Sequence, residues 1–100
     1  MITVTNENLE GIVSSGIAVI DFWSITCGPC RSIAPILEQI DSELPVTVGK
    51  VDVQAQHELT TKFGIVALPT LIFFSDGVEQ TRLVGIQSKK TIVDCINSLA

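Results

Sequence analysis

Two cysteines stand three residues apart in this chain, Cys27 and Cys30, with Gly28 and Pro29 between them. An apolar run precedes them and apolar residues at helical spacing follow, so we expect the pair where a strand gives way to a helix. Side chains three positions apart on a helix lie on one face, with Cβ atoms about 5–6 Å apart, and a small backbone adjustment then permits a disulfide. The free N–H groups and positive dipole end of the helix favour a thiolate at Cys27. The spacing therefore predicts cysteine chemistry, either redox exchange or metal binding.

The two residues between the cysteines favour redox exchange. Pro29 suits the first turn of a helix, where a missing N–H leaves no hydrogen bond unmade. Gly28 leaves room for the backbone of a partner to approach. Neither is a histidine or a cation, which would stabilise the thiolate further and make the disulfide strongly oxidising. We therefore expect a reductant of disulfides rather than an oxidant.

The elements that must position this pair alternate along the chain, which predicts an α/β layer fold with helices on both sides of a mixed sheet. Asn6 and Ser88 are expected to cap helices, and Asp76-Gly77 is a hairpin turn signal. Strands are expected over 17–23, 46–53, 71–75 and 78–84, and helices over 7–14, 30–44, 56–63 and from 89 onward.

The composition limits the class of protein. The chain has 100 residues, of which 46% are hydrophobic and 17% charged, and its formal net charge is -5. These values indicate one folded domain over residues 1–100 and argue against disorder and against nucleic-acid binding, which would need a basic face. No signal peptide or membrane span is visible in the sequence. Because the cysteines number only three, we expect a reducing compartment, the cytoplasm, and no binding to membranes.

Several motifs together resemble the thioredoxin family. Residues 21–35 contain Asp-Phe-Trp, Cys-Gly-Pro-Cys and Ile-Ala-Pro, and the segments 68–70, 76–77 and 84–85 follow in the family's order and spacing. The resemblance covers essentially the whole chain. It implies the thioredoxin fold, a central mixed β-sheet flanked by helices on both faces, in a single domain.

The resemblance also implies roles for four residues in protein-disulfide reduction. Cys27 corresponds to the nucleophile that forms a mixed disulfide with the substrate, and Cys30 to the resolving cysteine. Asp21 corresponds to a buried proton acceptor for Cys30, and Lys50 to a lysine near that carboxylate. The redox-active disulfide would then be the only redox group, with no separate cofactor or metal.

Partner contacts follow from the same resemblance. The residues implied to bind substrate are Trp23, Thr26, Gly28, Pro29, Leu68, Pro69 and Gly85, with a cis peptide bond before Pro69. The family usually has tryptophan where this chain has Thr26, so the rim of the site is smaller and more polar. We expect a monomer that reduces disulfide-containing proteins and is recycled by a thioredoxin reductase, either NADPH-flavin dependent or ferredoxin dependent.

Two other functions fit parts of the sequence. Cys27, Cys30, Cys95 and His57 would make a complete ligand set for tetrahedral zinc, although only one pair is close in sequence. A binding or assembly module could also keep the fold without turnover. For Cys95 the simplest interpretation is a small apolar core residue, and for His57 a surface position.

Overall fold

The computed structural model describes residues 1–100, with five strands and four helices. The strands form one sheet in the order β1-β3-β2-β4-β5. They are β1 (Ile2–Thr3), β2 (Ile17–Trp23), β3 (Thr47–Asp52), β4 (Thr70–Ser75) and β5 (Val78–Val84). The helices are α1 (Leu9–Val13), α2 (Gly28–Glu43), α3 (His57–Lys62) and α4 (Lys89–Leu99).

The sheet is mixed, as the sequence predicts. β3 is parallel to both β1 and β2, while β4 is antiparallel to β2 and to β5. The β4–β5 hairpin closes through Asp76 and Gly77, which have φ of 48° and 86°. Positive φ at both positions is the geometry that Asp-Gly turns favour, so the hairpin prediction is confirmed.

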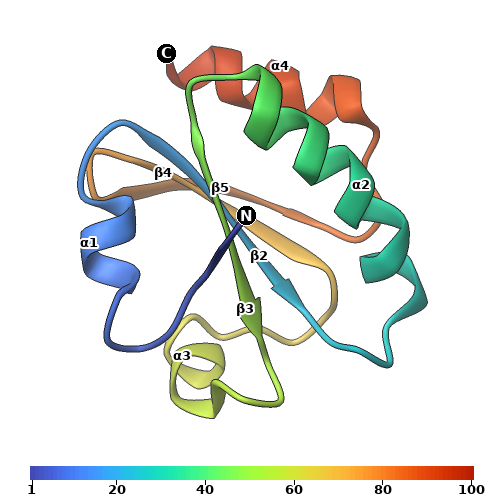
Figure 1. Ribbon diagram of the computed structural model, residues 1–100. Coiled ribbons are helices and arrows are strands. Elements are labelled where there is room, and N and C mark those ends of the chain that lie inside the picture. The colour runs from blue at the N-terminus through green and yellow to red at the C-terminus, as the bar shows by residue number, and fades with distance from the viewer.

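Helices cover both faces of the sheet. Figure 1 shows α2 and α4 packed together at the upper right, and α1 and α3 toward the lower left. Side chains of the central strands alternate between the two layers, because successive side chains of a strand point to opposite faces. On the α1 and α3 side the core includes Ala18, Ile20, Phe22, Ile72 and Phe74. On the α2 and α4 side it includes Val19, Val48, Leu71, Phe73, Ile33 and Leu37.

Most element boundaries agree with the sequence analysis, and the first helix is the clearest exception. Ser88 caps α4 as expected, since its Oγ accepts a hydrogen bond from the Thr91 N–H at 3.1 Å. The expected helix over 7–14 is shorter in the structure, and Asn6 is not its cap. The N-cap position is Asn8, while the Asn6 side chain donates to Glu58 at 3.1 Å. Asn6 thus joins the N-terminal segment to α3.

None of the helices is both long enough and apolar enough to cross a membrane.

Candidate active site

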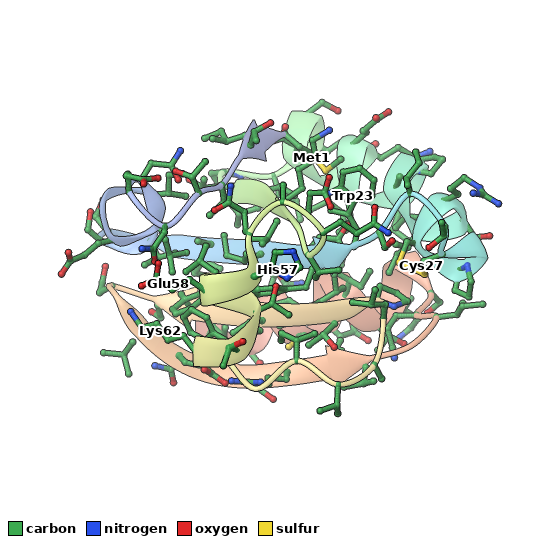
Figure 2. The ribbon with its side chains drawn as sticks, turned by 90° about the horizontal axis from the view of Figure 1, so that it is seen from below. Met1, Trp23, Cys27, His57, Glu58 and Lys62 are labelled. Atoms are coloured by element: carbon green, nitrogen blue, oxygen red, sulfur yellow. A yellow bond between two sulfur atoms is a disulfide. The ribbon has the colours of Figure 1, made fainter.

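The cysteine pair lies at the N-terminus of α2, just after the loop that follows β2. Cys27 is the N-cap residue of α2, and its Sγ accepts a hydrogen bond from the Cys30 N–H at 3.2 Å. The two residues form a disulfide, with their Cα atoms 5.3 Å apart. The helix begins at Gly28, two residues before the expected start, because Pro29 fits its first turn. Figure 2 shows Cys27 at this exposed end of the molecule.

The two sulfurs differ in their access to solvent. The Cys30 residue is only 4% exposed, whereas Cys27 is half-buried. Gly28 and Pro29 beside them are exposed. An external sulfur can therefore approach Cys27 far more readily than Cys30.

Asp21 lies in the middle of β2 with almost no access to water. The residue is 3% exposed, and its Oδ1 has no hydrogen-bond partner. Burial raises the pKa of this carboxyl to about 7, against a smaller lowering by the positive charge of Lys50. Lys50 is the register partner of Asp21 on β3. The carboxyl can therefore take up and release a proton near neutral pH.

A cavity of about 150 Å³ connects the carboxyl to the buried cysteine. It is large enough to hold water. Its lining residues are Met1, Asp21, Trp23, Cys30, Arg31, Ala34, Glu38 and Lys50. The structure thus brings Asp21, Cys30 and Lys50 together in the lining of one partly open cavity.

Trp23 forms one wall of this cavity. The Lys50 ammonium nitrogen lies 5.6 Å from the centre of the indole ring, within the range of a cation–π interaction. Figure 2 shows Trp23 beside Met1, which lines the same cavity. The indole Nε1 is buried without a hydrogen-bond partner. Trp23 therefore lines the cavity together with Asp21 and Lys50, and its ring lies against the Lys50 ammonium group.

A second loop reaches the same edge of the sheet before β4. The Leu68–Pro69 peptide bond is cis, as the family resemblance implied. Pro69 is buried, and its carbonyl accepts a hydrogen bond from the Gly85 N–H at 2.8 Å. Gly85 has a φ of 87°, which favours glycine at this position. Leu68 is half-buried and packs against the core under α1 and α3.

Thr26 is exposed immediately before the nucleophile. Its N–H donates to the Ser24 Oγ at 3.3 Å, and the two hydroxyl oxygens lie 3.1 Å apart. Ser24 itself is buried. The threonine side chain is thus part of a small polar turn rather than an apolar lip.

The zinc ligand set of the alternative function is not assembled. Cys95 packs on α4 against the core under α2, and burial raises the pKa of its thiol. His57 is exposed at the start of α3, on the other side of the sheet, and Figure 2 labels it there. No group of three or more His, Cys, Asp and Glu side chains is placed to hold a metal ion.

Arg31 is a site residue that the sequence analysis missed. Its guanidinium donates to the Ile25 carbonyl at 2.9 Å, so the first turn of α2 is tied to the loop before Cys27. The same side chain lines the cavity. The available signal in the sequence is a single cation placed directly after Cys30.

One accessible sulfur bonded to one buried sulfur can exchange its partner with an external disulfide. The fold and the site therefore define a thiol–disulfide oxidoreductase. The thioredoxin family model matches residues 1–98. The chain is 38% identical over 98 residues to a thioredoxin from Chlamydia pneumoniae, covering 97% of this chain and 96% of the relative. It is 36% identical over 98 residues to one from Staphylococcus saprophyticus, covering 96% and 94%.

The likeness extends to three dimensions. A mutant thioredoxin from Halobacterium salinarum superimposes with a TM-score of 0.94 at 29% identity, covering 98% of this chain and 88% of that one. The chain belongs to the thioredoxin family.

Proposed function

We propose that this protein reduces disulfides of other proteins, with Cys27 as the attacking sulfur, Cys30 as the resolving sulfur and Asp21 as the proton acceptor. The observation that carries these roles is the difference in access, because Cys27 is half-buried and Cys30 is only 4% exposed. A substrate sulfur can meet the first cysteine, and only the first cysteine's sulfur lies within reach of the second.

The reaction takes two exchange steps. In the reduced protein the Cys27 thiolate attacks one sulfur of a substrate disulfide, forms a mixed disulfide and releases the other substrate sulfur as a thiolate. The Cys30 thiol then gives its proton to the Asp21 carboxylate and attacks the Cys27 sulfur. This step forms the Cys27–Cys30 disulfide and releases the second substrate thiolate. Two electrons pass from the protein to the substrate, and no cofactor besides the cysteine pair is required.

Two positive charges modify these steps. The positive end of α2 and its free N–H groups stabilise the Cys27 thiolate. Lys50 opposes the effect of burial on the pKa of Asp21. Without Lys50 the pKa of the carboxyl would be higher, so at neutral pH a smaller fraction of molecules would have the carboxylate that can accept the Cys30 proton.

The substrate is proposed to dock across the loops that surround Cys27. Seven residues belong to this surface: Trp23, Thr26, Gly28, Pro29, Leu68, Pro69 and Gly85. The Gly85–Pro69 hydrogen bond supports this assignment, because it holds two of the loops together beside the cysteines.

The proposed source of electrons is a thioredoxin reductase, of either the NADPH-flavin or the ferredoxin-dependent kind. Residues 1–98 match the family model, and the bacterial relatives cover nearly the same length. We place the protein in the cytoplasm, as a monomer that works as one domain over residues 1–100.

The test is capture of the mixed disulfide. In a Cys30→Ser variant the first attack remains possible, but the intramolecular release step is lost, so substrate adducts should accumulate on non-reducing gels. The matched Cys27→Ser variant should trap nothing, and the unmodified protein should turn over insulin disulfides. Capture by the Cys27→Ser variant instead would reverse the two roles. Absence of insulin turnover by the unmodified protein would favour the alternative function, a binding module that keeps the fold without catalysing exchange.

A further inference from the structure

The cavity beside Asp21 has buried residues at one side and exposed residues of α2 at the other. Asp21 and Cys30 are only 3% and 4% exposed, whereas Arg31 and Glu38 are exposed, and all four line the cavity. Positions 31 and 38 are close to two helical turns apart, so both side chains leave α2 on the same face. The cavity is partly open, and it therefore connects the buried carboxyl with the surface of the molecule.

The proposed reaction requires Asp21 to exchange protons with water. Oxidation of the cysteine pair transfers the Cys30 thiol proton to the Asp21 carboxylate, and the carboxyl must lose this proton before it can accept another. The Asp21 Oδ1 has no hydrogen-bond partner, so no neighbouring side chain is bonded there to receive the proton. The cavity of about 150 Å³ is large enough to hold water. Water in the cavity is therefore the way out for the proton.

Glu38 is the one acceptor at the exposed end of this path. The Lys50 ammonium and the Arg31 guanidinium donate hydrogen bonds and accept none, and the Trp23 indole N–H is also a donor only. Glu38, in contrast, has a carboxylate, and none of the four ion pairs of the structure includes it. Its oxygens are therefore free to accept a proton from water in the cavity.

The remaining lining residues offer no comparable acceptor. Ala34 has no polar side-chain atom, and the thioether of Met1 is only a weak acceptor. The Met1 amino group lies 3.0 Å from the Asp41 carboxylate of α2, so these two charges are paired with each other. Cys30 is the source of the proton. By elimination, a side chain that passes protons between the cavity and solvent is Glu38.

We propose that Glu38 relays protons between Asp21 and solvent, through water held in the cavity that both residues line. This inference rests on the proposed function, because Asp21 needs rapid proton exchange only if it accepts the proton of Cys30. On oxidation the proton passes from Asp21 to cavity water, then to Glu38 and then to bulk water. On reduction of the disulfide a proton returns by the reverse path and ends on the Cys30 sulfur. Glu38 does not touch the reacting sulfurs and acts through Asp21.

A relay changes the rate of proton exchange and not its equilibrium. Uptake and release share one path, so both are accelerated by the same factor. The pKa of Asp21 is set by burial and, in the opposite direction, by Lys50. Loss of Glu38 should therefore slow the exchange of the Asp21 proton and leave its titration midpoint in place.

The test measures this exchange directly in the disulfide form of the protein. Both protonation forms of Asp21 are populated at pH 7, so NMR relaxation dispersion of its carboxyl carbon reports the exchange rate. Glu38→Gln keeps the size of an exposed side chain and removes the acceptor. In dilute buffer we expect exchange to slow by roughly tenfold, less than the loss of a directly reacting acid or base, because water partly substitutes. Imidazole, a small proton carrier, should restore the rate as its concentration rises.

Glu43→Gln is the matched control. Glu43 is an exposed carboxylate of the same helix that pairs with Lys89 at 2.8 Å and does not line the cavity, so its loss should leave exchange at Asp21 unchanged. Glu38→Asp retains a carboxylate and should keep most of the rate. Equal exchange rates in Glu38→Gln and Glu43→Gln would overturn the proposal. So would slow exchange that imidazole does not restore, or a displaced midpoint, since Glu38 would then act through structure or charge.

Insulin turnover separates this proposal from the proposed function, because the exchange measurement needs no substrate. If the unmodified protein reduces insulin while exchange at Asp21 is the same with and without Glu38, the proposed function stands and the relay fails. If Glu38→Gln slows exchange but the unmodified protein does not reduce insulin, the relay exists without serving the reaction, and the proposed function fails.

Discussion

The buried carboxyl of Asp21 links the stability of this fold to pH. Asp21 lies among core side chains, and burial holds its pKa near 7 rather than near 3.8. The folded state therefore binds this proton more tightly than the unfolded state does. Between about pH 4 and pH 7 the free energy of unfolding must fall as pH rises, because unfolding then releases a proton. The shift corresponds to on the order of 4 kcal/mol of lost stability at neutral pH.

Asp21→Asn should remove this cost and slow the exchange reaction. The amide is neutral, so the variant should be more stable at pH 8 by up to about 4 kcal/mol and should lose the fall in stability between pH 4 and 7. It cannot accept the proton of Cys30, so resolution of the mixed disulfide should slow more than its formation. Urea denaturation at several pH values and single-turnover kinetics measure the two effects.

Lys50→Met is the control for that variant. Loss of the positive charge should raise the pKa of Asp21 further, since Lys50 lowers it in the folded protein. The pH below which resolution slows should then move upward, while the carboxyl remains present. An Asp21→Asn variant with normal resolution across neutral pH would show that Asp21 is structural only.

The three cysteines should differ widely in reactivity. Cys27 stands at the N-terminus of α2 and is half-buried, Cys30 is 4% exposed, and burial raises the pKa of Cys95. Mild alkylation of the reduced protein should therefore label Cys27 first and Cys95 slowly or not at all. Peptide mass mapping of a short time course gives the order. Earlier labelling of Cys30 or Cys95 would contradict the assignment of the nucleophile.

At the scale of elements, sequence patterns were informative wherever side chains repeat with a regular period. The bounds of β2 and β5 agree with the expected ranges, because continuous apolar runs and the Asp-Gly turn mark them. The first helix was misplaced because Asn6 and Asn8 have the same capping propensity, and only tertiary contacts distinguish them. The Asn6 side chain donates to Glu58, whereas the Asn8 side chain accepts from the Thr5 N–H and donates to the Thr3 carbonyl. The cis bond before Pro69 came from family resemblance alone, since most such bonds are trans.

Contacts between residues of different loops could not be predicted, because no periodic pattern in the sequence marks them. The bond from Arg31 to the Ile25 carbonyl and the exposure of Val66 depend on tertiary structure. The cysteine pair and Asp21 could be identified because their residue types carry the chemistry. The exposure of Ile25, Val66 and Ile86 could not be identified in this way, because isoleucine and valine are ordinarily core residues.

Gly49 on β3 shows how closely the strands and the N-terminal segment pack. A Cβ at this position would lie 2.5 Å from Val4 Cγ2 and 3.0 Å from Ile20 Cδ1, and both neighbours are fully buried. Gly49→Ala should therefore destabilise the protein by about 1–3 kcal/mol. Gly11→Ala is the matched control, because it lies in α1 with nothing near the new methyl group. That change should stabilise the protein by up to about 1 kcal/mol. Equal denaturation midpoints for the two variants would contradict the close packing.

At the scale of the whole molecule, the charged and redox surfaces are separated. Residues 22–30, 63–75 and 83–88 carry no charged side chain, so the net charge of -5 comes from the rest of the chain. Asp21 and Arg31 immediately flank the first of these stretches. Asp21 is buried, and the Arg31 guanidinium donates a hydrogen bond to the Ile25 carbonyl. A partner at the reacting sulfur therefore meets few charges, and the exposed Arg31 is one of them.

Thr26→Trp should change how a reductase recycles the protein more than it changes the disulfide itself. Thr26 is exposed beside Cys27 and forms a small polar turn with Ser24. A tryptophan there would add apolar area to the docking surface, at about 25 cal/mol per Å² removed from water, and aromatic anchors often dominate interfaces. A thioredoxin reductase adapted to family members with tryptophan should recycle the unmodified protein poorly and the variant several-fold faster. Reduction by dithiothreitol needs little surface contact and should barely change. Paired steady-state assays with the enzyme and with dithiothreitol test this, and equal acceleration in both would show that Thr26 tunes the disulfide instead of docking.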